Sequence, residues 1–408
     1  MQRAAFFLGL LCATVFFVEV GRWSAGIPVS SWTSYLPVHS GKYRNTLQLE
    51  LSRATNSRGD PTVGQNASAE RYMIYYCQQF CGGWADRLKG IVIAYIIATL
   101  TNRTFGIQIL DNPCSLTEFL LPNEVNWVIP EHVDLKSGAE VYGKLQNRRF
   151  YKSIAVSNFD DIFTARVALF KANLDYFDNL KTNQLYQKQL QWMLPLTRDQ
   201  IFARIYKKLF KYSPSVQRAV DLALKAARPA KDIQLICGHL RFAKNSELVR
   251  DVSVRHTLEH GDTLLTFLQR FDPKSRTYNA TEAGQLVSAD SAPVASSKMR
   301  FFVTADSDVF INKAAKVFGR RFVRTNGTFV HVDKPGTNRQ AACDGFTKVL
   351  VDSYLLSTCD VLVISKSGYG RQAAYLRGTD RGLYCMLLNG TLVKCPVSGL
   401  KEVYNVRG

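Results

Sequence analysis

The sequence lacks the spacing of a zinc site, because no Cys-x-x-Cys pair with histidine partners occurs among its nine cysteines and six histidines. Acidic residues are scarce: 33 Asp and Glu stand against 52 Lys and Arg, and the formal net charge is +19. Such an excess suits nucleic acid, an acidic membrane surface or a small anionic substrate such as a nucleotide diphosphate. Hydrophobic residues make up 46% of the chain and charged residues 21%, which is the balance of a folded globular protein and not of a disordered one.

The N-terminus also lacks an apolar run as long as a typical membrane-spanning helix. Arg3 precedes an apolar stretch over 4–18, which is shorter than the ~20 residues of such a helix and suits a signal sequence. Two interpretations stay open. The first, which we favour, is a short uncleaved signal anchor over 1–21, since Golgi bilayers are thin; the second is a signal peptide cleaved near 24–26. Both deliver the chain to the lumen of the endoplasmic reticulum or Golgi, either as a single-pass type II protein held in the membrane by its N-terminal segment or as a secreted one. Both make nucleic acid a poor partner.

Residues 22–68 are rich in Ser, Gly, Pro, Arg and Asn and show no sustained apolar period, which predicts a stem or linker. A small degenerate domain is the alternative. Five Asn-x-Ser/Thr sequons favour a glycosylated lumenal protein, and they begin at Asn66, Asn102, Asn279, Asn326 and Asn389.

Eight of the cysteines are available for pairing in an oxidising compartment, since Cys12 lies in the apolar run. Their connectivity is not fixed by the sequence. One pair has a geometric basis: Cys385 and Cys395 are equidistant from Gly390, so a hairpin turning at Asn389-Gly390 brings them opposite each other.

Strand and helix patterns alternate along the chain after residue 70, which predicts an α/β fold with parallel sheets. The first unit has a strand over 72–77, a helix over 84–100 and a strand over 104–109, whereas 110–195 has no clear pattern. Later expected elements are helices at about 198–211 and 214–227, strands at 233–237, 299–304 and 360–365, and helices at 307–318 and 341–359. The length of 408 residues predicts two or three domains, and we expect two Rossmann-like domains, 69–230 and 231–408, with a ligand cleft between them.

A glycine turn separates the first strand from its helix. Gly82 and Gly83 allow backbone N–H groups to approach a phosphate at the helix N-terminus, and Asp86 and Arg87 follow in the first turn. The alternative is a tight turn with a surface ion pair.

Basic and acidic residues follow two later strands. His239 and Arg241 alternate after 233–237 and therefore lie on one side of the chain; an arginine fork suits a diphosphate, although a salt bridge is the alternative. After 299–304, Asp306 is a candidate to bind a base or ribose while Ser307 caps the next helix. Alternatively, Asp306 and Asp308 hold Mn²⁺ or Mg²⁺ against a diphosphate, or the segment only caps the helix.

Small residues follow the last long strand. Ser365, Lys366, Ser367 and Gly368 precede a helix and can form an anion-binding nest, or an ordinary strand-to-helix loop. Because the carboxyl ends of parallel strands meet at one edge of a sheet, we expect these segments to converge there.

These motifs resemble those of the inverting fucosyltransferases that act on core N-glycans, proteins, plant cell walls and rhizobial chitin oligosaccharides. The likeness rests on His239-Leu-Arg241, Thr304-Ala-Asp306-Ser307, Ser365-Lys-Ser-Gly368 and the glycine turn 81–90, and it spans about residues 70–380. The Arg-Arg or Arg-x-Gly-Asp that usually follows the first of these motifs is replaced here by 242–245.

The resemblance implies a GT-B fold, GDP-fucose as donor, and metal-independent inversion onto a glycan or protein hydroxyl. Residues 69–230 would form the acceptor side and 231–408 the nucleotide-sugar side. It also implies that Arg241 binds the β-phosphate, that Asp306 and Ser307 face the guanosine, and that 365–368 binds the pyrophosphate. Asp86 is our first candidate for the base and His239 the second.

Two other functions stay open. One is a metal-dependent glycosyltransferase in which Asp306 and Asp308 hold the ion and another nucleotide sugar is the donor. The other is a non-catalytic lumenal glycan-binding protein. The basic stretch 198–231 is interpreted as the solvated face of two helices and not as a binding surface.

Overall fold

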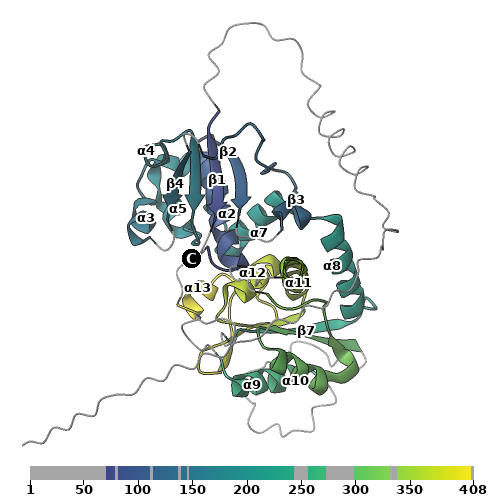
Figure 1. Ribbon diagram of the computed structural model, residues 1–408. Helices are drawn as coiled ribbons and strands as arrows, with labels where there is room; N and C mark the ends of the chain where they lie inside the picture. The colour runs from purple at the N-terminus through teal and green to yellow at the C-terminus, as the bar shows by residue number, and fades with distance from the viewer. Residues whose placement is uncertain are drawn as a thin grey trace, which may run out of the picture. The chain divides into compact units, whose positions relative to one another are not determined.

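The computed structural model places Ala67–Gly408 in one compact unit (Figure 1). The residues that it describes are 70–78, 81–110, 114–136, 139–144, 147–242, 256–272, 298–330, 332 and 338–405. The predicted signal anchor or signal peptide (1–21) and stem (22–68) lie outside these ranges and stay predictions. Within the ranges, no helix is both long enough and apolar enough to cross a membrane.

Four parallel strands form the first sheet, in the order β2-β1-β5-β4. β1 (Tyr72–Cys77), α2 (Trp84–Leu100) and β2 (Thr104–Ile109) have the bounds that the sequence predicts. The other two strands, β4 (Ala139–Gly143) and β5 (Val167–Lys171), come from the stretch without a clear pattern. α2 packs on β1 and β2 and is buried on nearly all sides, which explains why it is apolar all round.

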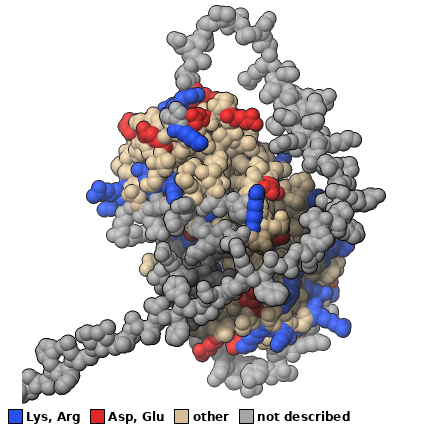
Figure 2. Space-filling view, in the orientation of Figure 1, with Lys and Arg blue, Asp and Glu red and all other residues tan. Residues whose placement is uncertain are grey.

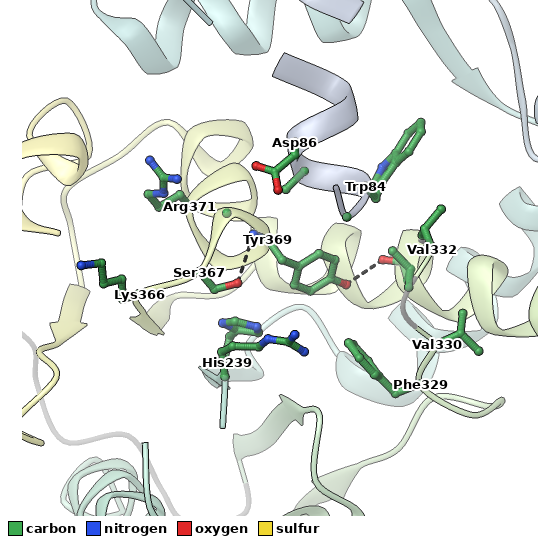
Figure 3. Close-up of a pocket in the computed structure, with 15 residues that line it drawn as sticks. Trp84, Asp86, His239, Phe329, Val330, Val332, Lys366, Ser367, Tyr369 and Arg371 are labelled. Carbon is green, nitrogen blue, oxygen red and sulfur yellow. Dashed lines mark hydrogen bonds between the residues drawn. The ribbon is translucent and has the colours of Figure 1, made fainter. Parts of the chain in front are cut away.

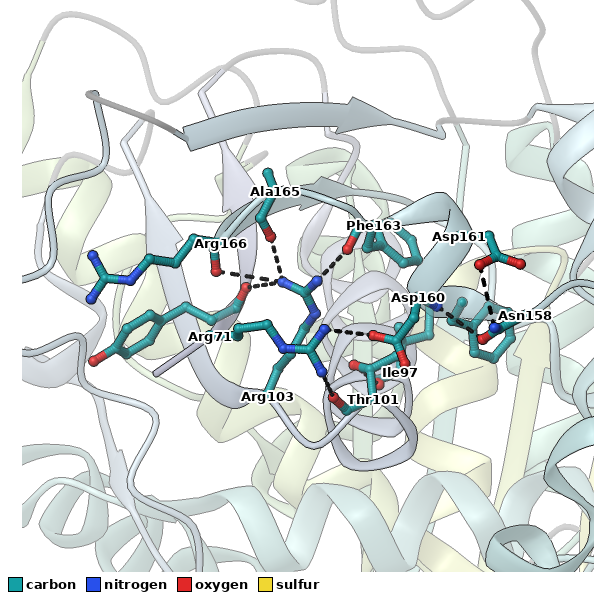
Figure 4. Close-up of polar contacts among 12 residues, drawn as sticks. Arg71, Ile97, Thr101, Arg103, Asn158, Asp160, Asp161, Phe163, Ala165 and Arg166 are labelled. Carbon is teal, nitrogen blue, oxygen red and sulfur yellow. Dashed lines mark hydrogen bonds and ion pairs between the residues drawn. The ribbon is translucent and has the colours of Figure 1, made fainter. Parts of the chain in front are cut away.

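A buried arginine secures one end of this sheet (Figure 4). The guanidinium of Arg103 donates to the carbonyl oxygens of Ala165, at 2.7 Å, and of Phe163, just before β5 begins. Nearby, the Nη1 of Arg71 lies 2.8 Å from Oδ1 of Asp160, but both of these side chains are partly exposed. Arg103 therefore satisfies two backbone acceptors that lie just before β5.

Short elements fill the stretch that the sequence left undefined. They are η1 (Leu116–Glu118), β3 (Leu120–Pro122), α3 (Arg148–Ser153), α4 (Phe159–Ile162), α5 (Phe177–Thr182), η2 (Gln184–Tyr186) and α6 (Gln187–Leu190). α7 (Arg198–Leu209) ends two residues earlier than predicted, because β6 (Phe210–Tyr212) leaves the helix to pair with β3. α8 (Pro214–Ala227) begins as predicted, with the Ser213 hydroxyl accepting from the Val216 N–H.

Six strands form the second sheet, in the order β12-β11-β10-β7-β8-β9, and only the β11–β12 pair is antiparallel. The strands are β7 (Gln234–Leu240), β8 (Met299–Ala305), β9 (Phe322–Val323), β10 (Val361–Ser365), β11 (Leu383–Met386) and β12 (Leu392–Lys394). Figure 1 shows α11 (Arg339–Ser357) and α12 (Gly368–Arg377) on one side of β7, and α9 (Leu258–Gln269) and α10 (Asp308–Phe318) on the other. Alternating side chains of β7 point to opposite faces of the sheet, so Leu235 and Cys237 pack in one core and Ile236 and Leu240 in the other.

The strand predicted over 233–237 extends to Leu240. β7 lies in the middle of the sheet, and β10 and β8 pair with it as far as His239 and Leu240. His239 is therefore a strand residue, and Arg241 is the first residue beyond the strand. The strands of the four-stranded sheet come before residue 230 in the sequence and those of the six-stranded sheet come after it. The division into two domains at this residue stays a prediction.

Four disulfides use eight cysteines. They are Cys77–Cys81, Cys114–Cys343, Cys237–Cys359 and Cys385–Cys395. The predicted Cys385–Cys395 pair is confirmed, and the hairpin that joins β11 to β12 turns at Gly390, whose φ is +84°. Most basic residues of the stretch 198–231 are exposed, as expected, whereas Arg198 is buried in an ion pair with Asp175. Figure 2 shows Lys and Arg spread over one face of the molecule and interspersed with Asp and Glu.

Candidate nucleotide-sugar site

A cavity of about 290 Å³ lies where three of the predicted motifs meet (Figure 3). Its walls come from the start of α2, the end of β7, the start of α12 and a segment before α11. The lining residues are Gly83, Trp84, Ala85, Asp86, His239, Arg241, Phe329, Val330, Val332, Val349, Lys366, Ser367, Gly368, Tyr369 and Arg371. Seven of the predicted site residues are among them: Gly83, Asp86, His239, Arg241, Lys366, Ser367 and Gly368.

The glycine turn brings a carboxylate to this cavity. Gly82 has φ +84°, and a Cβ there would lie 2.7 Å from Oδ2 of Asp86, so the turn requires glycine. The carboxylate of Asp86 lies 2.9 Å from the Nζ of Lys89 and is 40% exposed. Arg87, in contrast, is fully buried and its Nε donates to the Gly82 carbonyl. Arg87 thus stabilises the turn from behind and is absent from the lining.

Arg241 is held by residues at the ends of β8 and β10, the two strands that flank β7. Its Nη1 lies 2.7 Å from Oδ2 of Asp306, after β8, and its backbone N–H donates to Oγ of Ser365, at the end of β10, over 2.9 Å. The other Asp306 oxygen accepts from the Phe242 N–H at 2.7 Å. The Asp306 side chain is 1% exposed and Ser365 is buried. Both residues therefore position the Arg241 segment, and neither lines the cavity.

Ser307 and Asp308 belong to the start of α10. The Ser307 hydroxyl accepts from the Phe310 N–H at 3.4 Å, and Asp308 is exposed in the first turn. Helix capping at this position is thus confirmed. The described part of the chain contains no group of three or more His, Cys, Asp and Glu side chains arranged to hold a metal ion.

His239 is a buried, neutral imidazole at the base of the cavity. Burial, the charge of Arg241 and that of His256 lower its pKa to about 3. Its Nδ1 is buried without a hydrogen-bond partner among the described residues, and a Cβ on Gly370 would lie 2.8 Å from that atom. The glycine in α12 is therefore needed for the close approach of the helix to His239.

The start of α12 forms the remaining polar wall. The Ser367 hydroxyl accepts from the Tyr369 N–H at 3.3 Å, and the Tyr369 hydroxyl donates to the Val349 carbonyl at 2.7 Å. The Gln372 amide donates to the carbonyl of Ala85 at 2.8 Å, which ties α12 to α2. The N-termini of two helices therefore face one cavity, an arrangement that favours an anion.

Sequence reasoning missed several lining residues. Tyr369 and Arg371 lie in α12, and Arg371 could have been found because it is four residues beyond Ser367 and thus on the same helix face. Trp84 looked like an ordinary first helical residue. Phe329 comes from an irregular segment and carries no periodic signal.

Three of the five predicted glycosylation sites can be located. Asn102, Asn326 and Asn389 are exposed, whereas Asn66 and Asn279 lie outside the described residues. Their glycosylation stays a prediction.

No protein-family model matches the chain, and no curated protein matches it in sequence. Among solved structures, a mutant of Arabidopsis thaliana FUT1 in complex with GDP is 13% identical, with a TM-score of 0.52 over 84% of this chain and 74% of that one. NodZ α-1,6-fucosyltransferase soaked with GDP-fucose is 16% identical, with a TM-score of 0.45 over 80% and 100%. The Bradyrhizobium fucosyltransferase NodZ is 15% identical, with a TM-score of 0.43 over 80% and 99%. The likeness to FUT1 shows a shared fold, so the expected α/β architecture with parallel sheets is confirmed.

Proposed function

We propose that the chain is a glycosyltransferase that moves fucose from GDP-fucose to a hydroxyl of a glycan or protein, with inversion and without a metal ion. The observation that carries this proposal is the meeting of the glycine turn, the Arg241 segment and the start of α12 at one cavity. The fold shared with FUT1, whose structure contains GDP, supports it.

The geometry suits a diphosphate leaving group. When the acceptor oxygen bonds to C1 of the sugar, the bond from C1 to the β-phosphate oxygen breaks and negative charge grows on GDP. The guanidinium of Arg241, fixed by Asp306, and the N-termini of α2 and α12 would stabilise that charge. Phe329, Val330 and Val332 make another wall apolar, which suits the face of a nucleobase.

Asp86 remains our first candidate for the base. Its carboxylate lines the cavity and is partly exposed, so it can reach an acceptor hydroxyl. His239 is the weaker candidate, since a pKa of about 3 makes a poor proton acceptor. We expect His239 to contact the donor as a neutral group.

The secretory-pathway lumen remains the proposed location, with the membrane contacted through residues 1–21. Four disulfides support an oxidising compartment. Exposed sequons at Asn102, Asn326 and Asn389 support glycosylation there.

The test is transfer of labelled fucose from GDP-fucose to a panel of N-glycans and glycoproteins, with and without EDTA. We expect transfer that survives EDTA and is lost in Arg241→Ala. Loss of activity with EDTA would favour the metal-dependent alternative at Asp306 and Asp308. No transfer and no nucleotide binding would favour the glycan-binding protein.

A further inference from the structure

Arg371 is a buried cation in the lining of the cavity. Its residue exposure is 8%, and it lies one turn into α12, where its N–H bonds to the carbonyl of Ser367. Figure 3 shows it beside the start of the helix, on the same side as Lys366 and Asp86. No hydrogen bond or ion pair reaches its guanidinium from the described residues, unlike Arg241, which has Asp306.

Two carboxylates line a cavity together with Arg371, but Asp86 is ion-paired with Lys89 and Asp175 with Arg198. The charge of Arg371 also acts on two tyrosines. Burial raises the pKa of Tyr375 to about 12 and also raises that of Tyr404, so both hydroxyls stay neutral at physiological pH. Neither can balance a guanidinium. A buried charge without a counter-charge destabilises a protein, and a cation near a helix N-terminus also opposes the helix dipole.

The same features become favourable once an anion enters the cavity. Arg371 then gains an opposite charge, and the N-termini of α2 and α12 face that charge as well. A guanidinium offers paired N–H donors that match two phosphate oxygens. Figure 3 shows Lys366, Ser367 and Asp86 toward the Arg371 side of the cavity, whereas Phe329, Val330 and Val332 form an apolar wall on the opposite side.

We propose that Arg371 is a second phosphate-binding arginine, which binds the diphosphate of the nucleotide sugar together with Arg241. The inference rests on the proposed function for the identity of the donor. It adds a residue outside the motifs that carry the resemblance.

The test is calorimetric binding of GDP, guanosine and inorganic pyrophosphate to the full chain. The variants are Arg371→Gln, which removes the charge, and Arg371→Lys, which keeps the charge without the planar fork. Arg218→Gln is the control, since Arg218 is exposed on α8. We expect Arg371→Gln to bind GDP and pyrophosphate about tenfold or more weakly than wild type, while its affinity for guanosine is unchanged. The affinities of Arg371→Lys should lie between those of wild type and Arg371→Gln.

A second readout separates binding from a structural role. Because none of the described residues forms an ion pair with Arg371, we expect Arg371→Gln to melt at or above the wild-type temperature. Unchanged affinity for GDP and pyrophosphate in Arg371→Gln would overturn the inference, as would an effect confined to the KM of an acceptor. If the glutamine variant does not fold, equal affinities in wild type and Arg371→Lys would overturn it too.

The inference and the proposed function can fail separately. A wild-type chain that binds pyrophosphate but not GDP overturns the donor assignment, while loss of pyrophosphate binding in Arg371→Gln would still establish the anion site. A wild-type chain that binds neither overturns both.

Discussion

Arg241 and Asp306 form an ion pair at the carboxyl edge of the six-stranded sheet, with Nη1 2.7 Å from Oδ2. The same carboxylate accepts from the Phe242 N–H, so one aspartate fixes both the side chain and the following backbone. The guanidinium therefore lines the cavity in an orientation that the ion pair defines. Asp306 therefore influences a ligand in the cavity only by positioning Arg241.

We therefore expect Asp306→Asn to weaken GDP binding, although Asp306 does not line the cavity. The variant leaves Arg241 without its counter-charge. A fully buried pair loses about 3–5 kcal/mol when one partner is removed, and the 13% exposure of the Arg241 side chain makes the loss smaller here. We expect about tenfold weaker GDP binding and a lower melting temperature, measured by calorimetry.

Asp308→Asn is the matched control, since Asp308 is exposed two residues away. It should leave both quantities unchanged. Equal damage from the two variants, with binding that depends on Mn²⁺, would support a metal held by Asp306 and Asp308 and contradict the present assignment.

We expect the folded state to lose stability as the pH is lowered, because of His239. Its folded pKa of about 3 lies below the unfolded value near 6.5, so between these values the unfolded state binds a proton that the folded state does not. The loss begins below about pH 6.5 and amounts to about 2 kcal/mol by pH 5. Urea unfolding of wild type and His239→Gln across this range measures it. Identical pH dependence in the two proteins would show that His239 does not contribute.

How much of this could be read from the sequence differs between parts of the chain. The unit β1-α2-β2 was predictable to the residue, because its long apolar runs are separated by the glycine turn at 82–83 and by the polar residues 101–103. The stretch before α7 was not, since its helices and strands are too short for a period to show. Ser365 and Asp306 were recognised as motif residues, but their support of Arg241 depends on burial and on strand order, which only the fold reveals.

The disulfide between Cys114 and Cys343 should contribute more stability than the hairpin disulfide. It joins residues 229 apart in sequence, whereas Cys385 and Cys395 are 10 apart. Loop-closure entropy predicts about 3 kcal/mol for a loop of some 15 residues and more than about 4.7 kcal/mol for loops above 100. The measurement is the free energy of chemical unfolding of two variants, one with Cys114 and Cys343 replaced by serine and one with Cys385 and Cys395 replaced by serine. A larger loss for the hairpin pair would contradict the expectation.

Arg103→Met should destabilise the first sheet. It leaves the carbonyls of Phe163 and Ala165 without their donor, at about 1–3 kcal/mol for each buried acceptor. Arg71→Met, at a half-exposed pair with Asp160, should cost about 1 kcal/mol or less from that ion pair. The measurement is the free energy of unfolding of both variants. A loss in Arg71→Met that equals or exceeds the loss in Arg103→Met would refute the role of Arg103.

The most direct test of the central claim is the melting temperature of the chain with GDP, UDP, CMP and ADP, each with and without EDTA. GDP at 100 times its dissociation constant should add about 2.7 kcal/mol of stability. The account predicts a shift that is selective for GDP, survives EDTA and disappears in Arg241→Ala. A shift that requires Mn²⁺, or that persists in Arg241→Ala, would contradict it.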